Sequence, residues 1–286
     1  MKWWLNGQLV APESVNCSVQ TYSLHYGVSI FEGIRAYEVN GQPNIFRLES
    51  HINRFYDSAK MLGFSISAYQ PEQIIDACEK TVAHWSESNL YIRPLLYLGN
   101  GVMGIRTNEL DYNLIIMVWP YSIDRLSDRY QKGISVNISR HKRNRDFALA
   151  KVSGNYLASV VAANELAVSG YDEAILLDEN GFISEATAQN IFIVKDEKMK
   201  TPRLSACLAG ITRKSVMDIA EHMNIEVSET DILPVELLTA DEAFLTSTAS
   251  EILPIRSINY SHMASTHYDS VTRRIMRKYH ELVLQC

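Results

Sequence analysis

The sequence lacks the features that define several protein classes. It has only four cysteines in 286 residues, Cys17, Cys78, Cys207 and Cys286, and no CxxC pair. Neither a zinc site nor a disulfide framework is therefore indicated. The longest apolar run, residues 114–119, is too short to cross a bilayer, and the N-terminal residues lack the apolar core of a signal peptide. We expect reduced thiols in a cytoplasmic protein that binds no membrane.

Positive charge is also in deficit. The 27 Lys and Arg residues against 33 Asp and Glu give a net charge of −6, a balance that does not favour binding to nucleic acid. Gly and Pro number only 13 and 8, so no flexible or low-complexity tract is present. The 47% apolar and 21% charged residues are typical of a globular chain, long enough for one large or two ordinary domains.

Strand-like and helix-like segments alternate irregularly and without a repeat, which predicts an α/β (α+β) fold. Asn-Gly pairs at 6–7 and 40–41 lie between β-prone runs and predict β-connections or hairpins. Further strands are expected at 90–98, 114–119, 134–138, 173–177, 182–184 and 190–194, and helices at 48–62, 71–85, 155–168, 211–223 and 271–284.

A polar, charged stretch at 122–132 is the best candidate for a connection between domains. It separates a small N-terminal α+β domain, residues 1–121, from a larger domain, residues 133–286.

The run Gly99 to Gly104 satisfies G-x-G-x-x-G after a strand, as in dinucleotide-binding folds. The residues that follow are too turn-prone for the required helix, so a glycine loop at a strand end is the better interpretation.

Lys151 lies among small and apolar residues just before the helix expected at 155–168, whose apolar rows imply a wide buried face. Burial disfavours a charged amine, which lowers the pKa of a lysine and makes it available for Schiff-base chemistry. The alternative for any one lysine is a side chain that reaches solvent or forms an ion pair.

Two further segments indicate charged partners. Glu185 stands between small residues before an apolar strand, where an unpaired carboxylate is costly to bury. We therefore expect a cation beside it. Thr212 lies near the N-cap of the helix expected at 211–223, and Arg213 and Lys214 oppose its macrodipole. A bound phosphate explains this, as does ordinary capping with exposed basic residues.

Polar residues form a row on the helix at 48–62, beside its apolar stripe. They are Arg47, His51, Arg54 and Ser58, at i, i+4, i+7 and i+11. Such a row is typical of a solvated face. In the alternative interpretation, Arg54 turns inward toward an anion.

Seven ordered blocks of the sequence together resemble the fold-type IV pyridoxal-phosphate enzymes, and specifically the branched-chain amino acid aminotransferases. The blocks are HYGVSIFEGIRAY (25–37), RFYDSAK (54–60), YIRP (91–94), KVSGNYL (151–157), SEATAQN (184–190), GITR (210–213) and STASE (247–251). The resemblance implies a small N-terminal domain and a larger cofactor-binding domain with a β-barrel-like core.

The resemblance also implies roles in holding pyridoxal 5′-phosphate. Lys151 resembles the lysine that binds the cofactor covalently, Glu185 the carboxylate paired with the pyridinium nitrogen, and Tyr156 the partner of the phenolate oxygen. The residues that resemble the phosphate-binding group are Arg54, Gly210, Ile211, Thr212 and Thr248.

For substrate, the resemblance implies transfer of the amino group from L-leucine, L-isoleucine or L-valine to 2-oxoglutarate, which yields L-glutamate. Arg93 resembles the arginine that binds glutamate's distal carboxylate, and Ala249 and Tyr91 resemble the groups at the α-carboxylate. The other expected substrate contacts are Tyr26, Phe31, Met103 and Tyr121. Members contribute pocket residues across a dimer interface, so at least a homodimer is expected.

The chain departs from the family pattern at three positions. Tyr121 replaces a pocket tryptophan, Asp124 replaces a tyrosine, and Ala209 replaces a proline. The main alternatives are other fold-type IV enzymes, namely a D-amino acid or (R)-amine aminotransferase or an aminodeoxychorismate lyase. A non-catalytic vitamin B6 carrier is an alternative of another class.

Overall fold

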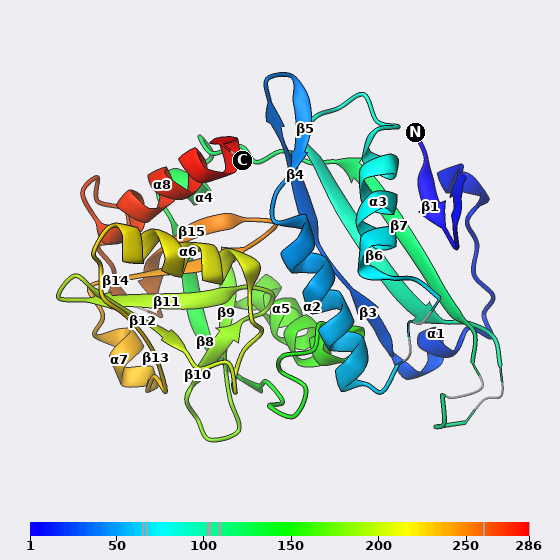
Figure 1. Cartoon of the computed structure of the whole chain (residues 1–286). Coiled ribbons are helices and arrows are strands. Elements are labelled where there is room, and N and C mark those ends of the chain that lie inside the picture. Colours follow the sequence, from blue (N-terminus) through cyan, green and yellow to red (C-terminus); the bar gives the residue numbers. More distant parts are fainter. Residues whose placement is uncertain (65, 67, 102–103, 108–109, 260, 286) are drawn as a thin grey trace. The chain divides into compact units, whose positions relative to one another are not determined.

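The computed structural model describes the whole chain except residues 65, 67, 102, 103, 108, 109, 260 and 286 (Figure 1). The chain divides into two compact units. Unit 1 comprises residues 1–122, 150–154 and 284–286, and unit 2 comprises residues 123–149 and 155–283. The short segment with Lys151 thus packs with unit 1, although the chain on both sides of it belongs to unit 2. The domain boundaries expected from the sequence stay a prediction.

Unit 1 contains a seven-stranded antiparallel sheet in the order β2-β1-β7-β6-β4-β5, with β3 paired to β6. Its strands are β1 (Trp3–Leu5), β2 (Gln8–Val10), β3 (Ser29–Phe31), β4 (Ile34–Val39), β5 (Gln42–Ile45), β6 (Leu90–Leu98) and β7 (Tyr112–Pro120). Its helices are the 3₁₀ turn Pro12–Ser14, α1 (Tyr22–Tyr26), α2 (Leu48–Met61) and α3 (Pro71–Val82).

Both Asn-Gly pairs form the predicted hairpins. β1 pairs with β2 and β4 with β5, and in each case the Asn-Gly pair occupies the turn. Asn6, Gly7, Asn40 and Gly41 all have positive φ angles, the backbone conformation that two-residue turns of this kind require.

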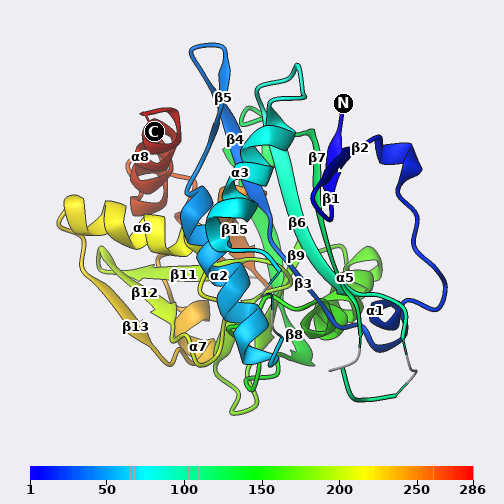
Figure 2. The same cartoon turned by 45° about the vertical axis from the view of Figure 1, so that its right-hand side comes forward.

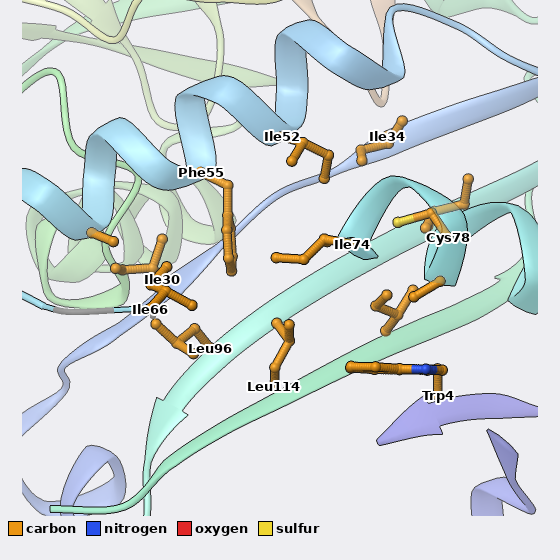
Figure 3. Close-up of a cluster of buried hydrophobic side chains, with 14 of the residues drawn as sticks. Trp4, Ile30, Ile34, Ile52, Phe55, Ile66, Ile74, Cys78, Leu96 and Leu114 are labelled. Carbon is orange, nitrogen blue, oxygen red and sulfur yellow. The ribbon is translucent and has the colours of Figure 1, made fainter. Parts of the chain in front are cut away.

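The core of unit 1 lies between α2, α3 and the sheet. The predicted stripe of α2 is buried at Leu48, Ile52, Phe55 and Ala59. Figure 3 shows Ile52 and Phe55 pointing from α2 toward the sheet and Ile74 of α3. The buried face that the apolar period of 3.6 residues predicted for this helix is therefore confirmed.

The G-x-G-x-x-G run does not form a dinucleotide site. β6 and β7, on either side of it, are neighbouring antiparallel strands, and Gly99 donates its N–H to the carbonyl of Asp111 at 2.8 Å. The run begins a connection between two antiparallel strands, and Val102 and Met103 lie outside the described residues. The glycine-loop interpretation is confirmed.

Unit 2 contains a nine-stranded mixed sheet in the order β10-β9-β8-β15-β14-β11-β12-β13, with β16 paired to β15. Its strands are β8 (Ile134–Lys142), β9 (Glu173–Leu177), β10 (Ile183–Ala186), β11 (Asn190–Lys195), β12 (Lys198–Pro202), β13 (Val227–Thr230), β14 (Glu242–Ser247), β15 (Glu251–Ile258) and β16 (Ser261–His262). Its helices are α4 (Asp128–Gln131), α5 (Leu157–Ser169), α6 (Ile211–His222), α7 (Pro234–Leu238) and α8 (Val271–Gln285), with a 3₁₀ turn at Ser153–Tyr156 that leads into α5.

The prediction of a wide buried face for the helix after Lys151 is wrong. In α5, Leu157 and Val168 are 73% and 92% exposed, and Val160 and Val161 are also exposed. Only small residues, Ser159 and Ala162, are buried in this helix, which lies against strands β8 and β9. An apolar helix face is therefore left uncovered within this chain.

No helix among the residues that the structure describes is both long and apolar enough to cross a membrane.

Replacement of Ile52 by Ala should lower the free energy of unfolding by about 2–5 kcal/mol, because the side chain is fully buried between α2 and the sheet. Ile105→Ala is the matched control. Its side chain is 80% exposed, so its effect should stay within about 0.5 kcal/mol. Urea unfolding followed by circular dichroism measures both, and equal losses would contradict the placement of this core.

Candidate active site

The backbone of Lys151 is held between β3 and α2 of unit 1. Val152 forms a β-bridge with Ile30, and Phe31 donates its N–H to the carbonyl of Lys151 at 3.2 Å. The N–H of Lys151 in turn donates to Ser58 Oγ at 3.0 Å. β3 and α2 lie side by side (Figure 2). The lysine is therefore fixed from both sides by regular structure, as a positioned nucleophile requires.

Three of the predicted substrate residues gather around this lysine. The Lys151 amine lies 4.7 Å from the centre of the Phe31 ring, and the Arg93 guanidinium lies 4.9 Å from the same centre. Arg93 also lies 5.5 Å from the centre of the Tyr91 ring. Its Nε atom is buried without a hydrogen-bond partner among the described residues. A buried guanidinium N–H of this kind is satisfied by an anionic ligand.

Tyr91 is positioned by aromatic neighbours and by a glycine. Its ring stacks on Trp119 at 5.0 Å and meets Tyr121 edge-on at 5.4 Å. A Cβ atom at Gly33 would lie 2.0 Å from the Tyr91 hydroxyl oxygen, so only glycine permits this close approach. The structure thus places Tyr121, another predicted substrate contact, beside Tyr91. It adds Gly33, which sequence reasoning missed.

One other predicted substrate residue, Tyr26, has its described contacts elsewhere. The contacts of Tyr26 lie on α1, where its ring stacks on Tyr22 at 4.4 Å and its side chain is 39% exposed. Met103 lies outside the described residues.

A buried carboxylate that the sequence reasoning missed organises the polar row of α2. Glu32 is fully buried between β3 and β4. It accepts hydrogen bonds from Arg54 Nε and Nη2, both at 2.8 Å, and from His51 Nδ1 at 2.8 Å. His51, Arg54 and Ser58 are all buried, so the interpretation of this row as a solvated face is wrong. Arg54 turns inward, and its planar fork is oriented by a bidentate ion pair.

This ion pair keeps its charges at neutral pH. Burial alone would raise the pKa of Glu32, but the charge of Arg54 and the hydrogen bonds from His51 and Arg54 outweigh it, and the pKa lies well below its usual range. Burial lowers the pKa of His51, and the opposing effect of Glu32 does not reverse this. The imidazole is therefore neutral and donates Nδ1–H to an ionised carboxylate.

The cation expected beside Glu185 is Arg143. Both side chains are buried in unit 2, and Arg143 Nε contacts Glu185 Oε1. The other carboxylate oxygen accepts from Asn190 Nδ2 at 3.2 Å and from the backbone N–H of Leu208 at 3.1 Å. An ionised carboxylate has about four acceptor positions, so these contacts orient Glu185 and leave it able to accept another donor.

Helix α6 begins with an N-terminus that has no side-chain cap. Its N-cap is Gly210, and a Cβ atom there would lie 2.0 Å from Asn190 Oδ1. Thr212 in the first turn is buried. The N–H groups of such a turn attract anions, and glycine at the N-cap lets a ligand or Asn190 come close.

The two basic residues of this first turn have partners of their own. Arg213 is buried and donates to Glu229 at 2.7 Å and to the carbonyl of Pro202 at 2.9 Å, while Lys214 pairs with Asp218 at 2.5 Å on the surface. Carboxylates of unit 2 thus neutralise both side chains, so these two cations do not by themselves indicate a bound phosphate. The phosphate at this helix start stays a prediction.

Thr248 and Ala249 lie in the tight turn between β14 and β15. The turn is braced by Ser247 Oγ and Ser250 Oγ, 2.7 Å apart, and by the Tyr130 hydroxyl, which donates to the carbonyl of Ser250 at 3.0 Å.

Tyr156 is half-buried at the start of α5. Asp124 stays exposed and accepts the N–H of Leu126 at 2.9 Å.

Comparison with known proteins gives a family for the chain. The model of the family "Amino-transferase class IV" matches residues 29–258. This chain belongs to that family. The branched-chain-amino-acid aminotransferase of Pseudomonas aeruginosa is 36% identical to it over 283 residues, which cover 98% of this class IV chain and 92% of the relative.

Solved structures of relatives match this class IV aminotransferase over nearly its full length. The branched-chain amino acid aminotransferase of Escherichia coli has a TM-score of 0.93 at 34% identity and covers 99% of this chain and 95% of its own. The enzyme of Thermoproteus uzoniensis, with norvaline, has a TM-score of 0.92 at 34% identity and covers 100% and 95%. The predicted fold type and family resemblance are confirmed.

A third relative has been solved with several ligands. It is a branched-chain amino acid aminotransferase whose source is abbreviated T.th., and with pyridoxamine 5′-phosphate it has a TM-score of 0.94 at 35% identity. The match covers 99% of this chain and 94% of the relative. The same T.th. protein is also complexed with N-(5′-phosphopyridoxyl)-L-glutamate and with 4-methylvaleric acid.

Replacement of Glu32 by Gln should lower the free energy of unfolding by about 3–5 kcal/mol at pH 7, because it leaves the buried Arg54 charge uncompensated. A carboxylate with a depressed pKa stabilises the fold above its unfolded pKa of about 4.3, and this contribution fades as the pH falls below that value. The difference between wild type and variant, measured by urea unfolding, should therefore shrink below about pH 4.

Glu38→Gln is the control for this measurement, because Glu38 is an exposed carboxylate on β4 of the same unit. Its effect should stay within about 0.5 kcal/mol at either pH. A Glu32→Gln variant as stable as Glu38→Gln would show that the ion pair contributes nothing net.

Proposed function

We propose that this class IV aminotransferase uses pyridoxal 5′-phosphate to transfer the amino group of L-leucine, L-isoleucine or L-valine to 2-oxoglutarate. The products are the branched 2-oxo acids and L-glutamate. The observation that carries the proposal is the packing of the Lys151 amine and the Arg93 guanidinium on one ring, Phe31, in a chain that matches branched-chain aminotransferases from end to end. This arrangement supplies a nucleophilic amine and a carboxylate-binding cation beside an apolar surface.

Pyridoxal 5′-phosphate, when bound, supplies an aldehyde that takes up the amino group and a ring that accepts the electrons of the broken Cα–H bond. Lys151 Nζ is the base and acid in this proposal: it removes the proton from the substrate Cα and returns it in the reverse direction. The clamp of its backbone by Ser58 and Phe31 limits the orientations that the side chain can take, which favours proton transfer at one face.

The residues of unit 2 fit the cofactor in two respects. Glu185 is buried and oriented by Arg143, Asn190 and Leu208, so it can hold a protonated ring nitrogen. Thr246, which pairs with Asn190 across β11 and β14, has a buried Oγ1 with no partner among the residues described. A buried hydroxyl without a partner among the described residues, opposite Asn190 in the sheet, is consistent with a polar ligand at this place.

The phosphate would be held by Arg54, by the N–H groups of Ile211 and Thr212 that follow Gly210, and by Thr248. A guanidinium, an uncapped helix start and a hydroxyl are the donor types that bind phosphate. Tyr156 would donate to the phenolate oxygen. These roles, with that of Lys151, agree with those implied by the seven sequence blocks.

Dual substrate use follows from the mixed character of the residues near Lys151. Phe31 and Tyr121 offer apolar contacts for a branched side chain, and Arg93 offers a cation for the distal carboxylate of glutamate. Tyr91 and the Thr248-Ala249 turn would bind the α-carboxylate shared by all substrates, while Tyr26 and Met103 would line the pocket. A relative that is complexed with a glutamate adduct in one structure and with 4-methylvaleric acid in another supports such a divided pocket.

A homodimer at least is part of the proposal. The apolar residues Leu157, Val160, Val161 and Val168 of α5 are exposed in the single chain. Apolar surface gathered on one helix favours association, and a second copy would cover it. The location in the cytoplasm stays a prediction from the sequence.

A half-reaction panel of L- and D-amino acids tests the proposed function. L-leucine, L-isoleucine, L-valine and L-glutamate should each convert the bound cofactor to its amine form, and 2-oxoglutarate should restore it, because Phe31 and Arg93 serve two side-chain types. Visible absorbance follows both directions. Conversion by D-alanine without conversion by L-leucine would contradict the substrate assignment and indicate a D-amino acid aminotransferase.

Lys151→Ala should abolish the visible absorbance of covalently bound pyridoxal phosphate and lower turnover by at least about 100-fold, since it removes both the attachment point and the proton carrier. Lys198→Ala is the control, because that lysine is exposed and pairs only with Glu226 on the surface. It should keep the absorbance and turnover of the wild type. Retained turnover in Lys151→Ala would overturn the assignment.

A further inference from the structure

Unit 2 contains a cavity of about 400 Å³ that no residue of the candidate active site lines. It lies against one face of α8, the helix at Val271–Gln285. The lining residues are Arg125, Gln131, Thr266, Tyr268, Arg273, Met276, Arg277 and His280. Those on α8 follow the i, i+3, i+4, i+7 spacing that puts them on one helix face.

The charge of this cavity is strongly one-sided. Three arginines, Arg125, Arg273 and Arg277, line it, and no Asp or Glu does so among the described residues. One of these arginines has a carboxylate partner: Glu251 accepts hydrogen bonds from Arg125 Nη2 at 2.6 Å and from Arg125 Nε at 3.1 Å. Two positive charges therefore remain in excess within a small volume.

Backbone carbonyls hold the other two guanidinium groups. Arg273 donates to the carbonyls of Tyr130, at 2.6 Å, and Gln131. Arg277 donates to the carbonyl of Tyr268 at 3.2 Å and lies 4.9 Å from the centre of that residue's ring. A carbonyl fixes the direction of a guanidinium without cancelling its charge. The cavity is thus preorganised for an anion.

The lining arginines also act on one another. Burial, and then the charge of Arg277, lowers the pKa of Arg273, which shows that the cations repel one another. An anion in the cavity would relieve this repulsion.

We infer that this cavity binds a phosphate dianion, either inorganic phosphate or a small phosphate monoester. Two negative charges match the excess of two positive charges, and tetrahedral oxygens accept from several guanidinium forks at once. Met276 and the Tyr268 ring leave an apolar wall for the organic part of a monoester. The site is separate from the residues proposed to hold the cofactor phosphate, and it stands whether or not the proposed function holds.

Calorimetric titration tests the inference at constant ionic strength. The protein is first loaded with pyridoxal 5′-phosphate, so that the proposed cofactor site is filled, and free pyridoxal 5′-phosphate is removed by gel filtration. It is then titrated with inorganic phosphate or with glycerol 3-phosphate. One saturable site per chain is expected for at least one of the two, and the tighter ligand distinguishes a free phosphate site from a monoester site. Succinate, a dicarboxylate of equal charge, should bind at least tenfold more weakly.

Arg277→Ala should weaken phosphate binding at least tenfold. Lys278→Ala is the matched control: it removes one positive charge from the next position of α8, where Lys278 pairs with Glu281 on the surface, and binding should change less than twofold. If Arg277→Ala fails to fold, Arg277→Gln, which keeps a side chain of similar length without the charge, replaces it, with a loss of at least tenfold expected. Absence of saturable binding to the wild type, equal losses in variant and control, or tighter binding of succinate would each overturn the inference.

Discussion

Glu32 is a fully buried carboxylate, and a buried carboxylate is tolerated only where a cation and hydrogen bonds surround it. In unit 1 those partners are Arg54 and His51, both on α2. The ion pair therefore fixes the rotation of α2 against β3 and β4, and the same helix presents Ser58 to the backbone of Lys151. The polar contacts that position the lysine and the apolar stripe that buries Ile52 and Phe55 thus depend on one orientation of one helix.

Unit 2 uses a similar arrangement for a different purpose. Glu185 also meets a buried arginine, Arg143, but its second oxygen is held by an amide and a backbone N–H. Glu32 is enclosed by donors from two side chains and serves to orient Arg54. Glu185 contacts Asn190, whose partner across the sheet, Thr246, has a buried hydroxyl without a partner among the described residues. Such polar surroundings suit a carboxylate that meets a ligand. Burial and charge alone do not separate the two roles; the neighbouring donors do.

The sequence predicted local structure where the signal was periodic or tied to a turn. The α2 stripe and the two Asn-Gly hairpins are right, because each depends on residues close in the chain. β14 and β15 were not predicted, because strands buried on both faces show no alternation. The exposed face of α5 was predicted to be buried, because an apolar row does not reveal whether this chain or another surface covers it.

The site residues divide along the same line. Lys151, Phe31, Tyr91 and Arg93 were found through motif resemblance, and the structure brings them together. Glu32 and Gly33 lie within one of the seven blocks, but their roles were not predicted. The partner of Glu32 lies 22 residues away on a helix, and the close approach that Gly33 permits involves another strand. Arg143 lies in a charged stretch without any local signal. Contacts between elements that are distant in the chain could thus not be predicted from one sequence.

The assignment of residues 150–154 to unit 1 has a consequence for synthesis on the ribosome. The bridge between Ile30 and Val152 joins residues more than a hundred positions apart, so the first 122 residues emerge before the segment that completes their packing exists. Unit 1 is complete only after residues 150–154, and finally residues 284–286, have been translated. Separate expression of residues 1–122 would yield a fragment that lacks Lys151. During translation, the folding of unit 1 therefore depends on segments that follow residues of unit 2 in the chain.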